Sequence, residues 1–398
     1  MKPRARILAA STVREIAAAL PGLGREGIGA ISSSHPSRVL IVDDLAPQEA
    51  ARASTVIREA GGDTAMLGTH LVWSATPSVR ATILDRLRQE PSLVGFYGAV
   101  SNALARWSEP PHDLALPDGR VLALGRRTHV MGIVNVTPDS FSDGGRFFDR
   151  GDAIAHGLRL AEDGADILDV GGESTRPGAA PVSDDDETER VLPVVEALAA
   201  KTAVPVSIDT TKAAVAKAAL DAGAQIVNDV SAARFDAAML PLVAQRRAPI
   251  VLMHMLGDPR TMQKDPRYED VVGEIAAFLE DRAGVAIANG VDRDRIVVDP
   301  GFGFGKTREH NLVLLQRLRE LRCLGFPVLA GTSRKSFIGA TLGDLPVEER
   351  LEGTAATVAL AVASGASIVR VHDVLAMRRV VAMVEGVLSG VQLPNRDG

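Results

Sequence analysis

Residues 205–229 read PVSIDTTKAAVAKAALDAGAQIVND, and they contain the unit that repeats through most of the chain. A short apolar run ends in Asp209, a segment with helical spacing finishes at Gly223, and a second apolar run ends in Asn228 and Asp229. Short apolar runs are typical of buried strands, and a glycine often ends a helix. The stretch therefore predicts a strand, a helix and a second strand, which is the unit of a parallel sheet.

The same alternation continues on both sides of this stretch. Helical segments such as REHNLVLLQRLRELRCLG separate eight apolar runs, which are VMGIVNV, ILDVGG, PVSID, IVND, PIVLMH, IVVDPG, PVLAGT and SIVRVH. Eight strand–helix units in ~270 residues match the size and repeat number of a TIM barrel. The alternative, a doubly wound open sheet, rarely contains eight consecutive equal units. We therefore predict an α/β fold with a (β/α)8 TIM barrel over residues 129–398.

A small α/β domain of unknown role is predicted before the barrel, over residues 1–107. RVLIVDD (38–44) has the composition of a buried strand, and PQEAARASTVIREAG (47–61) has the spacing of a helix that ends at glycine. We recognise no catalytic cluster in this part of the sequence. Two adjacent prolines and a Pro-Asp-Gly turn mark residues 108–128 as a linker and a hairpin that leads into the barrel.

Composition and charge narrow the classes of function. Apolar residues make up 46% of the chain and charged residues 24%, which is ordinary for a soluble globular protein. The formal net charge of −6 and the absence of a local basic cluster argue against a nucleic-acid partner. Cys323 is the only cysteine, which excludes disulfides within the chain and fits a reducing cytoplasm. The longest weakly polar run, residues 354–369, is too short for a membrane span and is broken by Ser364.

Polar residues stand at the end of every predicted barrel strand. In a TIM barrel all of these ends lie on the face that carries the active site. A single one, such as His254, could equally be a buried polar side chain with its hydrogen bonds satisfied. Eight together indicate a functional site. These residues are Asn135, Glu173, Asp209, Asn228 with Asp229, His254, Asp299, Ser333 to Lys335, and Arg370 with His372.

The chemical types of these residues indicate two subsites. Asp209, Asn228 and Asp299 offer hydrogen-bond acceptors, which suit the adjacent N–H groups of an aminopyrimidine edge. Cationic donors gather at strands seven and eight, where barrels most often hold a phosphate. They are Lys335, Arg370 and His372, with Arg176 on an earlier loop. We therefore expect a flat nitrogen heterocycle at the centre and an anion at the rim.

Two alternatives explain less of the sequence. Paired carboxylates could indicate glycoside hydrolysis, but this leaves the basic cluster unexplained, and aromatic residues are only 4% of the chain. A metal site of three or four histidines is not visible. A magnesium ion held by Asn135 and a substrate phosphate is compatible with the sequence, because Mg²⁺ often takes few protein ligands.

The stretch DPGFGFGKT (299–307) ends like a nucleotide-binding phosphate loop. Such a loop needs a glycine five residues before Gly305, so that backbone N–H groups surround a phosphate. That place holds Pro300, which has no N–H to donate. The stretch is therefore not a phosphate loop, and its glycines instead allow the backbone to pack close to flat rings.

Eight motifs in this order give the chain a specific resemblance to a known family. They are NVTPDSFSDGG, GADILDVGGESTRPGA, VSIDT, IVNDVS, MHMLGDPRTMQ, DPGFGFGKT, GTSRKSFIG and RVHDV, and they run from about His129 to about Glu385. Together they resemble the dihydropteroate synthases. The resemblance implies a TIM barrel, usually a homodimer, that acts in folate biosynthesis and is a target of sulfonamides. It also implies a transferase that joins 6-hydroxymethyl-7,8-dihydropterin diphosphate to 4-aminobenzoate and releases diphosphate.

The resemblance also implies roles for individual residues. It assigns the pterin to Asp209, Asn228, Asp299 and Lys335. It assigns the diphosphate, with Mg²⁺ at Asn135, to Asn135, Arg176, Arg370 and His372. It assigns 4-aminobenzoate to Thr175, Arg176, Pro177, Phe304 and Ser333. The residues expected to be catalytic are Asp209, Lys335, Arg370 and His372.

The implied reaction is substitution at the pterin methylene, with no nucleophilic side chain and with loops 137–145 and 174–183 closing over the site. A methyltetrahydrofolate-dependent methyltransferase on the same barrel is one alternative, but it has no use for STRPGA or for Ser-Arg-Lys at strand seven. A non-catalytic pterin-binding paralogue is the other, and it predicts eroded loops. The motifs are intact, which favours the synthase. The first hundred residues have no counterpart in the compact bacterial form of the family.

Overall fold

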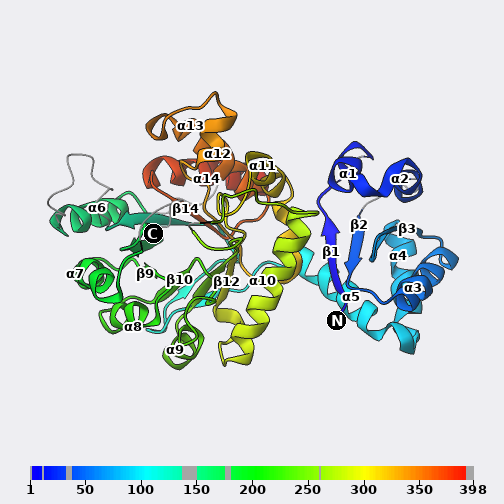
Figure 1. Ribbon diagram of the computed structural model, residues 1–398, viewed down its shortest axis with the longest axis horizontal. Helices are drawn as coiled ribbons and strands as arrows, with labels where there is room; N and C mark the ends of the chain where they lie inside the picture. Colours follow the sequence, from blue (N-terminus) through cyan, green and yellow to red (C-terminus); the bar gives the residue numbers. More distant parts are fainter. Residues whose placement is uncertain are drawn as a thin grey trace. The chain divides into compact units, whose positions relative to one another are not determined.

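The chain divides into two compact units in the computed structural model, which describes residues 2–10, 13–32, 38–136, 150–174, 181–259 and 261–390 (Figure 1). The first unit comprises Met1–Pro110 together with Arg317–Gly325, and the second comprises Pro111–Gln316 and Phe326–Gly398. The segment Arg317–Gly325 lies inside the sequence range predicted for the barrel, yet it packs with the first unit.

The second unit is built around one parallel eight-stranded sheet. Its strands follow the order β12-β11-β10-β9-β8-β7-β14-β13, and a parallel bridge between Val298 and Val328 joins the two outer strands. This closes the sheet, so the predicted TIM barrel is confirmed. The strands are β7 (His129–Asn135), β8 (Ile167–Gly171), β9 (Val206–Asp209), β10 (Ile226–Asp229), β11 (Ile250–Met253), β12 (Ile296–Asp299), β13 (Leu329–Ala330) and β14 (Ile368–Val371).

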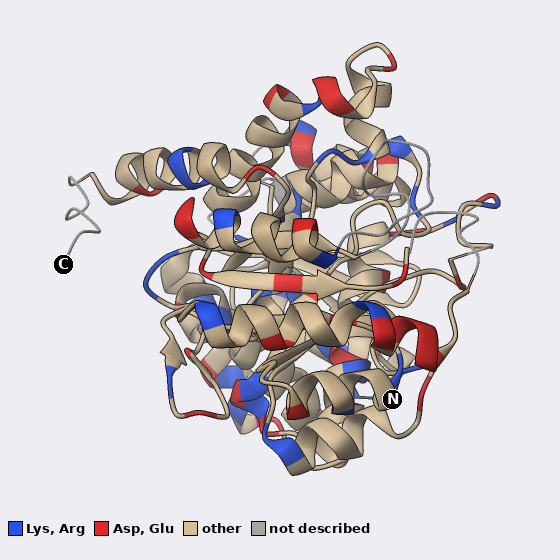
Figure 2. Cartoon of the chain, turned by 90° about the vertical axis from the view of Figure 1, so that its left-hand side faces the viewer, with Lys and Arg blue, Asp and Glu red and all other residues tan. Residues whose placement is uncertain are grey.

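Helices follow the barrel strands along the chain. Ser183 begins one of them, α7 (Asp184–Lys201), by accepting a 3.1 Å hydrogen bond from the N–H of Asp186. Figure 2 shows Lys and Arg interspersed with Asp and Glu along the helices. None of the described helices combines the length and the apolar composition that a bilayer crossing requires. The other helices are α6 (Arg150–Glu162), α8 (Ala213–Asp221), α9 (Met239–Arg246), α10 (Val271–Ala288), α11 (Arg308–Gln316), α12 (Ser336–Thr341), α13 (Leu351–Ala363) and α14 (Val374–Ser389), with 3-10 turns Arg293–Arg295 and Val347–Glu349.

A short hairpin closes one end of the barrel. It consists of β5 (Leu114–Ala115) and β6 (Val121–Leu122), and the side chains of Leu114, Leu116 and Leu124 are buried with it. They pack against residues near the start of the strands, among them Met131, Ile167, Ile226, Val251, Val297, Leu329 and Ile368. The amino-terminal end of the barrel is therefore filled by apolar side chains, and the carboxyl ends of the strands are left to form a site.

The first unit is an antiparallel sheet covered by helices. The strands β1 (Arg4–Leu8), β2 (Val39–Asp43), β3 (Asp63–Leu67) and β4 (His70–Ser74) have the order β1-β2-β4-β3. In β2, Leu40 and Val42 belong to one buried cluster, and Val39 and Ile41 belong to another. Both faces of this strand are covered, which explains its continuous apolar run. The helices are α1 (Val13–Ala19), α2 (Gly24–Ser32), α3 (Pro47–Glu59), α4 (Pro77–Gln89) and α5 (Val94–Ser108), with 3-10 turns Pro21–Leu23 and Pro91–Leu93.

The 3-10 segment η5 (Leu318–Leu324) completes the core of the first unit. Glu320, only 1% exposed, accepts hydrogen bonds from Arg6 Nη1 at 2.9 Å and from Arg317 Nε at 2.7 Å. The backbone N–H of Ile7 donates to Cys323 Sγ at 3.3 Å, and Cys323 is buried in the same cluster as Trp107. Arg6 and Ile7 are more than three hundred positions from Glu320 and Cys323 in the sequence, so the first unit is discontinuous along the chain.

Candidate active site

The structure brings most of the predicted site residues to the carboxyl ends of the strands. Asn135 ends β7, Asp209 ends β9 and Asp299 ends β12, while Asn228 and Arg370 each precede the last residue of their strands. Ser333 and Lys335 follow β13, and His372 follows β14. Thr175, Arg176 and Pro177 lie outside the described residues.

Arg370 is the centre of a network that joins three strands. Its Nε donates to Asp169 Oδ2 at 2.6 Å, and its Nη2 donates to Asp209 Oδ2 at 2.7 Å. The same Asp169 oxygen accepts a 3.0 Å hydrogen bond from Asn228 Nδ2. Two of the three Arg370 nitrogens are thus bound to carboxylates, and Nη1 forms no hydrogen bond within the described part of the chain. The predicted contact of Arg370 with diphosphate stays a prediction.

Burial changes the acidity of this network. It raises the pKa of Asp209 to about 7, although the nearby Arg370 guanidinium acts in the opposite direction. Burial also disfavours the charged form of Arg370, but Asp169 and Asp209 outweigh this and raise its pKa. A carboxylate that titrates near neutrality, held by a permanently charged guanidinium, is typical of a functional site.

Lys335, which follows β13, and Asp299, at the end of β12, form another part of the site. Burial lowers the pKa of Lys335 to about 8 and raises the pKa of Asp299, while their mutual attraction opposes both shifts. The Lys335 ammonium donates to the carbonyl of Phe302 and lies 4.6 Å from the centroid of the Phe304 ring. The N–H of Gly301 donates to Asp299 Oδ1 at 2.7 Å. An acceptor, a cation and an aromatic ring therefore stand together.

A second pair joins the ends of β13 and β14. Ser333 Oγ and His372 Nδ1 are 2.9 Å apart, so residues predicted for 4-aminobenzoate and for diphosphate are in direct contact. Arg334, between Ser333 and Lys335, instead forms a bidentate pair with Asp373 at 2.9 and 2.6 Å. This pair fixes the turn that presents its two neighbours.

The DPGFGFGKT loop is held by contacts inside the protein. Gly301, Gly303 and Gly305 have φ angles of 67°, 82° and 64°, a region that favours glycine. A Cβ atom on Gly301 would lie 2.0 Å from the carbonyl oxygen of His254. A Cβ atom on Gly305 would lie 2.5 Å from Leu256 Cβ. Glycine is therefore required at both positions by contacts within the protein, in addition to the close approach to flat rings that the sequence suggested.

The end of this loop turns inward. Lys306 is buried, and its Nζ donates to the carbonyls of Gly301 and Phe304 at 2.9 and 3.0 Å. It also lies 3.0 Å from His254 Nδ1. Burial lowers the pKa of both Lys306 and His254. His254 therefore acts as a satisfied core side chain, the alternative considered for it from the sequence.

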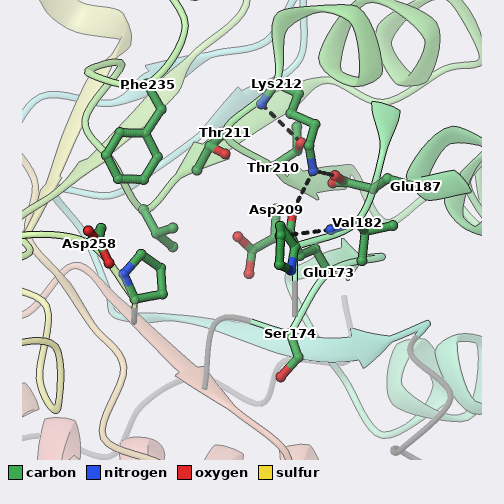
Figure 3. A pocket seen from close by; sticks show the side chains of 13 residues that line it. Glu173, Ser174, Val182, Glu187, Asp209, Thr210, Thr211, Lys212, Phe235 and Asp258 are labelled. Atoms are coloured by element: carbon green, nitrogen blue, oxygen red, sulfur yellow. Dashed lines mark hydrogen bonds and ion pairs between the residues drawn. The ribbon is translucent and has the colours of Figure 1, made fainter. Parts of the chain in front are cut away.

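A cavity of about 300 Å³ opens beside Asp209 (Figure 3). Lys212 lies at its edge, where its ammonium contacts the carboxylates of Glu173 and Glu187. Burial disfavours the charge of Lys212, but the hydrogen bonds that it donates to these carboxylates outweigh this effect and raise its pKa. Glu173 Oε1 also accepts from the N–H of Val182 at 3.3 Å. Glu173, after β8, is thereby linked to Val182, just before α7, and through Lys212 to Glu187 within α7.

Three further charged residues of the site were not predicted from the sequence: Asp169, Lys212 and Glu187. Asp169 is fully buried inside the apolar run ILDVGG, and a charged residue in such a strand was a usable signal. Lys212 follows Asp209 by three positions, so it too could have been assigned to the strand end. Glu187 belongs to the acidic run DDDE at the start of α7, which looks like a solvated helix end.

The arrangement can bind a flat ring with N–H groups on one edge and a carbonyl on the other. Asp209, Asn228 and Asp299 supply acceptors, and Lys335 supplies a donor. In the described part of the chain, no three His, Cys, Asp or Glu side chains gather in a way that could hold a metal ion. A site for a metal with many protein ligands is therefore not found there.

The family described as pterin binding enzyme matches residues 131–372, the range that holds this site. A dihydropteroate synthase from Synechocystis sp. is 49% identical over 278 residues, which cover 70% of this chain and 95% of that protein. This chain belongs to the dihydropteroate synthase family. The dihydropteroate synthase of Escherichia coli is 46% identical over 261 residues, 66% of this chain and 92% of that protein.

Solved dihydropteroate synthases have the same fold as the second unit. The Xanthomonas albilineans dihydropteroate synthase with 4-aminobenzoic acid is 48% identical, with a TM-score of 0.66 over 71% of this chain and all of that one. The same enzyme in complex with 7,8-dihydropteroate gives 47% identity and a TM-score of 0.62 over 70% of this chain and 98% of that one. The family match leaves residues 1–130 uncovered, so the amino-terminal segment of the first unit lies outside the matched region, while Arg317–Gly325 lies within it.

Proposed function

We propose that the chain acts as a dihydropteroate synthase, which joins 6-hydroxymethyl-7,8-dihydropterin diphosphate to 4-aminobenzoate and releases diphosphate. The observation that carries this proposal is the set of Asp209, Asn228, Asp299 and Lys335 at one barrel mouth. Three acceptors and one cationic donor fit the aminopyrimidinone edge of a pterin. Complexes of the Xanthomonas enzyme with 4-aminobenzoic acid and with 7,8-dihydropteroate, a substrate and the product of this reaction, support the proposal.

The residues proposed to bind the ring would hold it in a buried place beside an aromatic side chain. A buried carboxylate binds ring N–H groups strongly because little water competes there. Lys335 stands close to Phe304, so a ring held between Asp299 and Lys335 has an aromatic wall beside it. Phe304 in turn packs against Val230, Met253, Met255 and Met262, which keeps that wall in place.

The chemical step is a substitution at the pterin methylene. The carbon–oxygen bond breaks with its electron pair going to diphosphate, and the lone pair of the arylamine forms the new carbon–nitrogen bond. The amine then loses one proton to water. An arylamine is a neutral nucleophile at pH 7, so the step requires no nucleophilic side chain. His372 and Arg370, near the rim, would offset charge that develops on diphosphate.

Magnesium fits this proposal as an ion with few protein ligands. Mg²⁺ usually retains water and binds one or two protein oxygens together with substrate phosphates, which agrees with the absence of a three-residue acidic or histidine cluster among the described residues. Asn135 at the end of β7 would supply the protein oxygen. The ion would neutralise charge on the diphosphate leaving group.

This proposal includes the predicted roles toward diphosphate of Asn135, Arg176, Arg370 and His372. It also includes those of Thr175, Arg176, Pro177, Phe304 and Ser333 toward 4-aminobenzoate. Inhibition by sulfonamides is part of it as well, and a Yersinia pestis dihydropteroate synthase is known in a sulfonamide complex.

A direct test is diphosphate release by the purified protein given the dihydropterin diphosphate and Mg²⁺, with and without 4-aminobenzoate. We expect release that depends on 4-aminobenzoate, formation of dihydropteroate, and at least ~100-fold lower kcat/KM in Asp299→Ala and Lys335→Ala. Pterin binding without turnover would overturn the proposal in favour of a non-catalytic pterin-binding protein. Methyl transfer from methyltetrahydrofolate would overturn it in favour of a methyltransferase.

We also propose a cytoplasmic homodimer formed through the barrel unit. Exposed apolar side chains on α13 and α14 support the dimer, because such side chains usually mark a protein interface. They are Leu360, Met383, Val387 and Leu388, each more than half exposed. Sedimentation velocity measures the oligomeric state directly, and a monomer at micromolar concentration would contradict the proposed dimer.

A further inference from the structure

Asp169 is a buried carboxylate for which the proposed reaction has no direct use. It lies within β8, is 0% exposed, and its side chain reaches Asn228 on β10 and Arg370 on β14. These strands are the second neighbours of β8 on either side in the barrel. Alternate strands contribute the side chains of one interior layer in a TIM barrel. Asp169 therefore lies in the interior layer beneath the site and touches two residues of the site at once.

The chemistry of Asp169 determines how Asn228 is turned. Asp169 Oδ2 accepts from the Arg370 guanidinium and is an acceptor toward Asn228 as well. Asn228 must therefore direct its NH2 group, its donor end, at Asp169, and the 3.0 Å contact from Nδ2 to Oδ2 has this sense. The other end of the amide, Oδ1, is turned away from Asp169. Within the described part of the chain, no hydrogen bond to Asn228 Oδ1 is formed, so this acceptor is available to a ligand.

Asp169 also fixes the orientation of Arg370. The guanidinium is planar, and its Nε and Nη2 bind Asp169 and Asp209 at 2.6 and 2.7 Å. Two contacts from one rigid plane define its orientation. Asp209 in turn accepts from Arg370 through Oδ2. Its other oxygen, Oδ1, accepts no hydrogen bond from the described residues.

We propose that Asp169 is a positioning residue that sets the hydrogen-bond polarity of the pterin site. It makes Asn228 present an acceptor, so that the site shows three acceptors and one cation to the ring. This inference rests on the proposed function, because it concerns the substrate edge that the same site recognises. It predicts that the site selects rings whose edge carries N–H donors.

The first test is Asp169→Leu in the full-length chain. Leucine has a similar shape but offers no acceptor, so the NH2 group of Asn228 loses the partner that fixes its direction. Either end of the Asn228 amide can then face the substrate. We expect the Kd for 6-hydroxymethyl-7,8-dihydropterin diphosphate, measured by calorimetry, to rise at least tenfold. The KM for 4-aminobenzoate at saturating pterin should change less than twofold.

The decisive comparison is with Asp169→Asn, which removes the same charge but keeps an acceptor. One oxygen of Asp169, Oδ2, accepts from both Asn228 and Arg370, so an amide oxygen in its place preserves both contacts. Asn228 then still turns its Oδ1 toward the substrate. We expect the pterin Kd of Asp169→Asn to be at least threefold lower than that of Asp169→Leu. Asn228→Asp sets two carboxylates against each other and should bind the pterin more weakly than Asp169→Asn.

A matched control lies one residue beyond Asn228. Asp229 is also 0% exposed, but it accepts from the N–H and Oγ of Ser231 and from the N–H of Ala233, within its own loop. Asp229→Leu should lower the melting temperature without the tenfold change in pterin Kd. Unchanged pterin affinity in Asp169→Leu, or no recovery of affinity in Asp169→Asn, would overturn the proposal. Both outcomes are read from pterin binding, so they are distinct from a failure of turnover in the parent protein.

Discussion

Asp209 and Lys335 must carry opposite charges for the site to bind a pterin as described, and burial moves both groups toward neutrality. The pKa of Asp209 is raised to about 7, so this carboxylate is charged only above that pH. The pKa of Lys335 is lowered to about 8, so this ammonium is charged only below that pH. The doubly charged form is therefore most populated between about pH 7 and pH 8.

We therefore expect a bell-shaped pH dependence of pterin affinity with its maximum in this window. Below it, Asp209 gains a proton and loses both its attraction to Arg370 and an acceptor; above it, Lys335 loses its charge. Calorimetry with 6-hydroxymethyl-7,8-dihydropterin measures this without titration of a diphosphate. Asp209→Asn should flatten the acidic limb. A constant affinity from about pH 6 to pH 9, one unit beyond each pKa, would show that neither group controls binding.

At the residue scale, the sequence predicted charged groups where they stand at strand ends and failed where they stand inside strands. Asp209 and Asp299 each end an apolar run, and a carboxylate in that place of a barrel indicates a site. Asp169 ends no run, and its partners Asn228 and Arg370 are far away in the sequence. Its role depends on the closure of the barrel, which brings β10 and β14 to either side of β8, and a linear pattern does not contain that information.

The loop between β12 and α11 shows at the scale of one element how backbone geometry holds a site. Gly301 has a φ of 67°, and an added Cβ would meet the His254 carbonyl oxygen at 2.0 Å. Gly301→Ala should therefore lower the free energy of unfolding by ~2 kcal/mol or more, from backbone strain and from displacement of the loop. It should also weaken pterin binding, since the Gly301 N–H donates to Asp299.

A control glycine is available in the same unit. Gly284 lies within α10, and a Cβ there would meet no atom within 4 Å. Gly284→Ala should raise the free energy of unfolding by about 0.5–1 kcal/mol, because glycine is unfavourable inside a helix. Chemical denaturation followed by circular dichroism compares the two variants. Equal effects of the two substitutions would contradict the role assigned to Gly301.

For this loop the sequence predicted less than the structure shows. Pro300 excluded a phosphate loop, and the glycines indicated unusual backbone conformations. The direction of Lys306 was not predictable, because a lysine after a glycine-rich turn normally points to solvent. It is buried here because the carbonyls of Gly301 and Phe304 and the ring of His254 converge on one point. Such convergence is a property of the folded loop alone.

At the scale of the whole molecule, the discontinuous first unit gives a testable dependence. Glu320 is 1% exposed and binds both Arg6 and Arg317, so its removal takes a carboxylate partner from two buried guanidinium groups. Arg6 retains a 3.6 Å ion pair with Asp43. Glu320→Ala should lower the stability of the first unit by about 3–5 kcal/mol. The only tryptophans, Trp73 and Trp107, both lie in this unit, so fluorescence reports its unfolding alone.

Breaking an exposed ion pair in the same unit provides the comparison. Arg52 binds Glu90, and their side chains are 49% and 24% exposed. Arg52→Ala should cost less than about 1 kcal/mol, as is usual for surface pairs. Thiol modification of Cys323, the only cysteine, should accelerate in Glu320→Ala and remain slow in Arg52→Ala. A loss in Glu320→Ala no larger than in Arg52→Ala would contradict the role given to Glu320.

The division of the chain into two units was harder to predict from the sequence than the site or the individual elements. Both the barrel and a preceding small α/β domain could be inferred, because strand–helix alternation is a local pattern. Residues 308–325 looked like one helix from their spacing, whereas α11 ends at Gln316 and a 3-10 segment follows. The apolar and charged side chains of that segment face partners in the first unit, and helical spacing alone could not distinguish those partners from barrel neighbours.

The separation of Arg6 from Glu320 by 314 positions has a consequence for synthesis on the ribosome. The first hundred residues emerge early, but their core lacks the 3-10 segment until translation has passed residue 325. By then β7 to β12 have already been made. The amino-terminal unit of the nascent chain must therefore wait, incomplete, while most of the barrel is translated, which reverses the usual order in which domains finish folding from the amino terminus onward.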